Sequence, residues 1–203
     1  GIPFPYTEEM PSKKNGHSND PENFGADYAF FMDHSPAEIH PHEQIVGEFH
    51  WQLDEARRFR YPEKQRELGR QARLLGAGGI SFNHTTPDLS IGLSLGWKGL
   101  LEKIRRNRSK YEEYGNQQSV QYLNGAEQVA LSISRFIARH AERAEELSAA
   151  ESDPELKENY RQVAQTCRAI SQDAPKTLQQ AVQWIQFYLL ADRIIGHGNG
   201  YGR

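Results

Sequence analysis

Three groups of residues in this 203-residue chain have side chains and spacings that could support chemistry. The first is a histidine-rich segment, the second is a lone cysteine, and the third is a pair of loops framed by glycines. Each group has a chemical interpretation and a simpler structural one.

The histidine-rich segment "HPHEQIVGEFH" contains His40, His42, Glu48 and His50. Two histidines one residue apart can both ligate a metal from a strand, because alternate residues share a face. The spacing approaches the HxH…E pattern of cupin metal sites, but Glu48 comes one position late and Pro41 would lie inside the strand. We therefore expect a surface turn without a metal. A metal-binding protein that uses His40, His42 and His50 remains a less favoured alternative.

The lone cysteine, Cys167, lies between Val163 and Ile170 on the apolar stripe of a predicted helix. A reactive cysteine needs a lowered thiol pKa and a nearby base. The apolar surroundings instead predict a small buried hydrophobic residue. One cysteine allows no intrachain disulfide, which fits a reducing, cytoplasmic setting.

The glycine-framed loops are "GAGGISFNHTTPD" and "GHGNGYGR". Glycine permits a positive φ and close approach of the backbone to a ligand. Polar side chains on both loops could line one pocket: His84 and Asp88 on the first, and His197, Asn199, Tyr201 and Arg203 on the second. On spacing alone, helix ends and connections explain both loops better.

The elements that position these loops are predicted to be mainly helical, with at most a few short strands. Apolar residues at helical spacing predict helices after Tyr61, around Leu93–Ile104, over about 117–151, after Pro154 and after Thr177. The ends of these helices carry local stop and start signals. Gly76–Gly79 stops the first helix, Arg105, Arg106 and Arg108 suit the end of the second, Asp153 is an N-cap, and Thr177 with Gln180 has capping-box spacing.

Two other segments are predicted to lack helix. Residues 1–36 are expected to be irregular, with a polar loop between Pro11 and Phe24, because Pro, Gly, Asn and Ser recur every few positions. Glu43–Trp51 is compatible with a short strand. The main body is then expected over residues 37–203.

The net charge of -3 gives no electrostatic case for nucleic acid or an anionic membrane. The longest apolar stretch, "WIQFYLLADRII", is too short and too polar to span a bilayer, and no secretory signal is visible. The first residue is Gly1, so we expect the chain to begin inside a longer gene product or after a processing or cloning cut.

Four segments, in order, make the chain resemble the glycyl radical enzymes, the pyruvate formate-lyase-like superfamily. They are "IHPHEQIVGE", "GGISFNHTTPDLSIGLSLGWKGLLEKI", "FIARHAERAEELSAAESDPELKENYRQVAQTCRAI" and "APKTLQQAVQWIQFYLLADRIIGHGNGYGR", within Ile39–Arg203. The resemblance implies part of the helical periphery and half-barrel of an α/β barrel. It also implies a glycyl radical, installed by a radical-SAM activating enzyme, that passes to a thiyl cysteine and cleaves a C–C or C–heteroatom bond of a small substrate.

The radical glycine motif and the active-site GC.E motif are absent from these residues, so the resemblance implies an N-terminal portion that is inactive alone and holds no catalytic residue. Its implied partners are the rest of the polypeptide, the activating enzyme and a second copy in a homodimer. The substrate contacts it implies are His84, Asp88, Asn199 and Tyr201. A helical interaction module without chemistry is the alternative from another class.

Overall fold

A computed structural model describes residues 10–15, 20–48, 67–68, 70–71 and 87–194 of the chain. In these residues the regular structure is helical, and no strand occurs among them. The helices are α1 (Pro11–Asn15), α2 (Pro21–His34), α5 (Leu89–Glu113), α6 (Gln117–Ala150), α7 (Pro154–Ile170) and α8 (Leu178–Ile194). The predicted strand is therefore wrong over its described part, Glu43–Glu48, while residues 49–51 lie outside the description.

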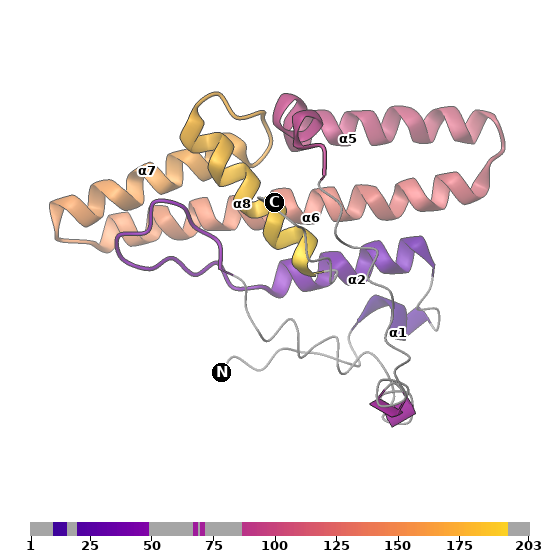
Figure 1. The fold of residues 1–203 in the computed structure, drawn as a ribbon, viewed down its shortest axis with the longest axis horizontal. Coiled ribbons are helices and arrows are strands. Elements are labelled where there is room, and N and C mark those ends of the chain that lie inside the picture. Colours follow the sequence, from indigo (N-terminus) through magenta and orange to yellow (C-terminus); the bar gives the residue numbers. More distant parts are fainter. Residues whose placement is uncertain (1–9, 16–19, 49–66, 69, 72–86, 195–203) are drawn as a thin grey trace.

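Helix α6 is the central helix of the fold, and α5, α7 and α2 all pack against it (Figure 1). It runs over the predicted range, because its apolar stripe and the Asn116 N-cap are both local signals. Helix α5 lies along one half of α6 and α7 along the other, while α8 crosses obliquely (Figure 1). The predicted N-cap of α7 is confirmed, since Asp153 accepts from the N–H groups of Glu155 and Leu156 at 2.9 and 3.0 Å.

The region expected to be irregular contains α1 and α2, which is a correction. Helix α2 begins with an Asp20 N-cap, whose carboxylate accepts from Glu22 N–H at 2.7 Å, followed by Pro21 in the first turn. Its buried face includes Tyr28 and Met32. The apolar face is short and interrupted by polar residues, so tertiary packing against α6 decides this helix more than its own periodicity.

Two glycines allow α2 to lie close alongside α6 (Figure 1). A Cβ placed on Gly25 would overlap the backbone of Gly125, and one placed on Gly125 would overlap the carbonyl of Pro21. Farther along the contact, Arg135 holds Asp33 through two hydrogen bonds of 3.0 and 2.7 Å. The contact between α2 and α6 therefore depends on small residues in the first half of α2 and on charge pairing near its end.

Helix α5 contains a break that its sequence pattern does not predict. Gly96 has φ 62° and ψ -179°, which divides the element into a two-turn segment and a longer helix. The predicted helix end at the arginines is wrong, since the helix continues to Glu113. Arg105 and Arg108 instead bind Glu127 of α6, with the Arg105 Nε–Glu127 Oε1 distance at 2.6 Å.

Helix α8 is buried along most of its length and starts with the predicted cap. Thr177 Oγ1 accepts from Gln180 N–H at 3.2 Å, and Gln180 Oε1 accepts from Lys176 N–H at 2.7 Å. Trp184 and Phe187 are each about 1% exposed. The fully buried residues form one face, and the other side chains over 183–192 are half-buried, so the predicted burial on more than one side holds only as partial burial, whereas Leu178 and Val182 at the start of the helix are exposed.

Candidate functional site

One of the four predicted substrate-binding residues, Asp88, lies within the described part of the chain. His84, Asn199 and Tyr201 lie outside it, as do His197 and Arg203. Most of the predicted helix after Tyr61 also lies outside, with residues 67–68 and 70–71 described as helical. The geometry can therefore be built for the elements that carry the two loops, which are α5 and α8.

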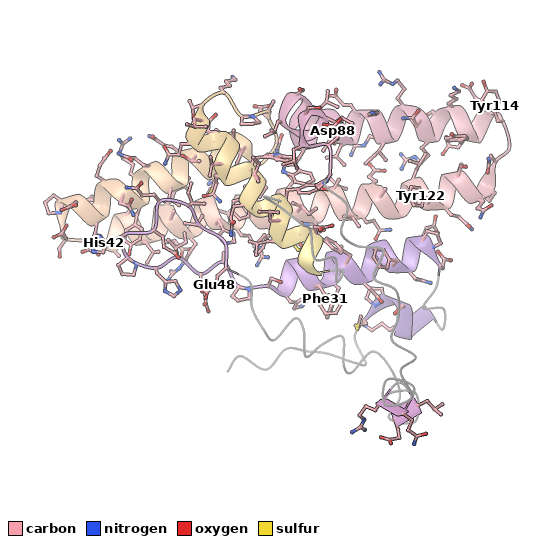
Figure 2. The ribbon with its side chains drawn as sticks, viewed as in Figure 1. Phe31, His42, Glu48, Asp88, Tyr114 and Tyr122 are labelled. Carbon is pink, nitrogen blue, oxygen red and sulfur yellow. The ribbon has the colours of Figure 1, made fainter. Side chains whose placement is uncertain are left out.

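Asp88 is the N-cap of α5 (Figure 2). Its Oδ1 accepts from Ser90 N–H at 3.0 Å and from the Ser90 hydroxyl at 2.5 Å. These hydrogen bonds lower the pKa of the Asp88 carboxyl, so the group is ionised at neutral pH. An ionised, exposed carboxylate can accept further hydrogen bonds from a ligand, and its capping role also fixes its position at the start of α5.

Two glycines let the start of α5 pack closely, Gly92 against α8 and Gly96 against the segment before α8. A Cβ on Gly92 would overlap the indole of Trp184, and one on Gly96 would overlap the backbone at Asp173 and Ala174. After the break at Gly96, Lys98 N–H donates to Gln172 O at 2.8 Å instead of to its own helix. The start of α5, which Asp88 caps, is thereby held against α8 and the segment before it.

Aromatic stacking fills the junction between the two helices. The rings of Trp97 and Trp184 stack at 5.3 Å between centroids, and Trp184 stacks on Tyr188 at 5.6 Å. Trp97 and Trp184 are also almost fully buried. Rigid side chains of this size give the junction between α5 and α8 a defined geometry. A binding site on the loops that adjoin these two helices requires such a fixed support.

Helix α8 is anchored on its other side by amide side chains. Gln183 Oε1 accepts from Val46 N–H at 2.8 Å, and Gln183 Nε2 donates to Val46 O at 2.7 Å. Gln186 Nε2 donates to Gly47 O at 2.9 Å, and Asn159 Nδ2 of α7 donates to Glu43 O at 2.8 Å. These residues were not predicted as functional; the available signal was the presence of glutamines, among them Gln183 and Gln186, within the uncharged helix.

Tyr28 fixes the last turns of α8 to α2. Its hydroxyl donates to Ala191 O at 2.8 Å, and burial followed by the nearby Asp192 raises the pKa of the phenol well above its usual value. The phenol therefore stays protonated and acts as a donor. The segment that leads to Asn199 and Tyr201 thus leaves the described core from a position tied to α2.

The histidine-rich segment brings together a different set of residues from the predicted one. Glu38, His40 and Glu48 have potential ligand atoms within 4.8 Å of one another, and all three are exposed. His40 Nε2 lies 3.0 Å from Glu48 Oε2, and this contact raises the pKa of the imidazole. The set omits His42, which is labelled in Figure 2 and has a φ of 67°, and His50 lies outside the described residues. An exposed ion pair between His40 and Glu48 is sufficient to explain why these side chains lie together.

Cys167 has the predicted structural environment. Its side chain is fully buried, and burial raises the pKa of the thiol to about 12. The thiolate is therefore scarce at neutral pH. Among the helices described, none is long and apolar enough to cross a bilayer.

The family model described as "Pyruvate formate lyase-like" matches residues 77–203. A solved glycyl radical enzyme from Archaeoglobus fulgidus has a TM-score of 0.73 at 17% identity, over 95% of this chain and 32% of that one. The chain belongs to the pyruvate formate lyase-like family, and its described helices match a helical portion of a glycyl radical enzyme. The predicted resemblance is confirmed.

Two further matches are to dehydratases. The (2S)-3-sulfopropanediol dehydratase of Klebsiella oxytoca is 28% identical over 126 residues. This match spans 59% of the present chain and 15% of the relative's length. The glycerol-bound B12-independent glycerol dehydratase of Clostridium butyricum has a TM-score of 0.70 at 15% identity, over 91% of this chain and 30% of that one.

Proposed function

We propose that this chain is the N-terminal portion of the catalytic domain of a glycyl radical dehydratase acting on a small hydroxylated substrate. The observation that carries the proposal is the sequence match to a diol dehydratase, within the family to which residues 77–203 belong. Glycyl radical chemistry supplies hydrogen abstraction, and the glycine and thiyl cysteine it needs are expected outside these residues. This chain would contribute one side of the substrate pocket.

The proposed role of these residues is to hold the substrate's hydroxyl groups. Ionised Asp88 would accept a hydrogen bond from one hydroxyl, because its pKa is lowered and the side chain is not enclosed by the fold. A protonated His84 imidazole would donate to the departing hydroxyl, since loss of water from a carbon requires a proton on that oxygen. Asn199 and Tyr201 would supply uncharged donors and acceptors from the second loop.

The test uses the complete gene product that contains these residues, expressed without oxygen together with a radical-SAM activating enzyme. We expect an organic-radical EPR signal and conversion of a vicinal diol into an aldehyde or ketone. The diols to supply are glycerol, 1,2-propanediol and a sulfonated propanediol. Formation of acetyl-CoA from pyruvate and coenzyme A would replace the dehydratase proposal with acyl transfer, and the lack of any radical signal would remove both.

His84 is tested in the same preparation. The His84→Ala variant should keep the radical signal and lose turnover by roughly a hundredfold, the scale of a general acid. Unchanged turnover would place His84 outside the pocket. Loss of the folded protein would leave the question to His84→Gln, whose amide can still donate a hydrogen bond but cannot supply a proton.

Asp88 requires a test that separates binding from capping. Asp88→Asn keeps a good N-cap but removes the charge, whereas Asp88→Ala removes both. If Asp88 contacts the substrate, Asp88→Asn should melt like the parent but turn over roughly tenfold more slowly. Its KM should change, while its radical yield should stay close to that of the parent. Turnover equal to that of the parent would restrict Asp88 to its role in α5.

A further inference from the structure

Two helical segments of this chain carry no charged side chain at all. They are residues 89–97, at the start of α5, and residues 177–191, which include most of α8. Charged residues make up 25% of the chain, so roughly two and four charges would be expected in stretches of these lengths. Burial explains the absence of charge only for the core-facing positions, such as Trp97 and Trp184.

Several positions on these segments face outward and are nevertheless apolar. The exposed aliphatic side chains are Ile91 and Leu95 of α5 and Leu178 and Val182 of α8, here called the α5–α8 face. Leu178 is 81% exposed. The two segments pack together through the Gly92–Trp184 contact and the Trp97–Trp184 stacking, so their exposed sides belong to one region of the molecule.

Two other exposed surfaces in the described part of the chain have a different character. The open groove between α6 and α7 is bordered by Glu145, Lys157, Arg161 and Arg168, and Arg168 pairs with Glu145 at 2.8 Å. The tip of the α5–α6 hairpin carries tyrosines, with Lys110 over the ring of Tyr114 (Figure 2). Depletion of charge at a surface, combined with exposed aliphatic groups, marks the core of a protein interface.

The junction beneath the face also contains buried hydrogen-bond donors without acceptors among the described residues. The indole N–H groups of Trp97 and Trp184 are buried and have no hydrogen-bond acceptor in the described part of the chain. Buried donors in proteins nearly always have an acceptor. A region that lacks both hydrogen-bond acceptors and a cover over its aliphatic side chains is therefore incomplete in the described residues alone.

We propose that the α5–α8 face packs against the remainder of the pyruvate formate lyase-like domain, contributed by further polypeptide of the same gene product. The length of the relatives supports this occupant: 91% of this chain corresponds to 30% of the solved glycerol dehydratase. The inference rests on the proposed function in so far as it assumes that larger domain. The face would border the substrate pocket, because Asp88 caps the start of α5 and α8 leads towards Asn199 and Tyr201.

The test places two glutamates on the face, in the variant Leu178→Glu/Val182→Glu. Acidic residues near the start of a helix suit its dipole, so α8 itself should not be weakened. The matched control is Gln118→Glu/Tyr122→Glu, which puts the same charges at exposed positions near the start of α6. Both pairs have the i, i+4 spacing and add the same net charge.

The variants are compared in the 203-residue chain and in the complete gene product by circular dichroism and thermal melting. In the 203-residue chain, both pairs should melt within about 3 °C of the parent, because all four positions are exposed. In the complete product, the α8 pair should lower the first melting midpoint by more than about 5 °C or prevent soluble expression, while the control pair stays near the parent.

Equal behaviour of the two pairs in the complete product would overturn the proposal, as would a gene that encodes nothing beyond these residues. Light scattering adds one more outcome. A dimer of the 203-residue chain that the α8 pair dissociates would assign the face to a second copy instead. Because stability and turnover are measured separately, a complete product that lacks dehydratase activity but still shows the selective loss of stability would retain this interface and lose only the proposed function.

Discussion

Gln183 of α8 binds both backbone groups of Val46, accepting from its N–H at 2.8 Å and donating to its carbonyl at 2.7 Å. All of these groups belong to buried residues. The side-chain amide therefore gives Val46 the pairing that a neighbouring strand would otherwise provide, although no strand is formed in the described residues. The segment around Val46 is attached to α8 by this side chain and by Gln186 beside it.

Replacing Gln183 with leucine should destabilise the protein strongly. The substitution leaves the N–H and carbonyl of Val46 buried without partners, at about 1–3 kcal/mol for each unsatisfied group. Denaturant unfolding followed by circular dichroism measures the change. Gln179→Leu, at an exposed position of the same helix, is the matched control and should change the free energy of unfolding by less than about 0.5 kcal/mol. Similar effects of the two substitutions would contradict the pairing.

Replacing Gly25 with alanine should force α2 and α6 apart. The added methyl group would overlap the backbone of Gly125, and backbone atoms cannot turn aside as a flexible side chain can. We expect a loss of about 2–3 kcal/mol in the free energy of unfolding, the upper range for overpacking.

Gly115→Ala provides the comparison for that substitution. Gly115 has φ 66°, and a Cβ added there would meet no other atom within 4 Å, so its replacement tests backbone strain without crowding. That cost is about 1 kcal/mol. A smaller loss for Gly25→Ala than for Gly115→Ala would show that the contact between α2 and α6 relaxes easily.

The link between α5 and α6 should weaken in acid. Partial burial of Glu127 works to raise the pKa of its carboxyl, but hydrogen bonds from Arg105 and Arg108 outweigh it and lower the pKa below 4.5. A depressed folded-state pKa stabilises the fold above the unfolded value of 4.5, and this contribution is lost as the pH falls through the folded value. Glu127→Gln should therefore reduce stability by about 1 kcal/mol at pH 7, with the difference from the parent shrinking below pH 4.5. A difference that does not depend on pH would assign the effect to packing.

Cys167 should react slowly in the folded protein. Burial raises the pKa of its thiol to about 12, so both access and thiolate concentration are low at pH 8. Labelling with a chromogenic disulfide reagent should be more than about a hundredfold slower in buffer than in denaturant. Rapid labelling of the folded chain would indicate that α7 opens or that the thiol has a role beyond packing.

Local signals account for the elements that were predicted correctly. The apolar stripe of α6 and the Asp153–Pro154 start of α7 are encoded by residues within a few positions of one another. The family resemblance likewise depended on ordered segments that can be recognised along the chain. These features needed no knowledge of which segments meet in space.

Long-range contacts account for what was missed. The break at Gly96 is explained by Asp173 and Ala174, whose backbone lies against it. The role of Gln183 is explained by its partner Val46, which is 137 positions away. Helix α2 was missed for the same reason, since its close contact depends on Gly125 of α6. Of the predicted site, Asp88 now has a defined geometry, while His84, Asn199 and Tyr201 remain predictions.

The glycine contact between α2 and α6 also has a consequence for chain entropy. It brings together residues about a hundred positions apart; for example, Asn124 donates to Glu22 across a separation of 102 residues. The entropic cost of closing a loop rises only with the logarithm of its length, so doubling such a loop costs roughly 0.6 kcal/mol. Related proteins can therefore lengthen or shorten the connections between these helices at little cost in loop-closure entropy, provided that both glycines are kept.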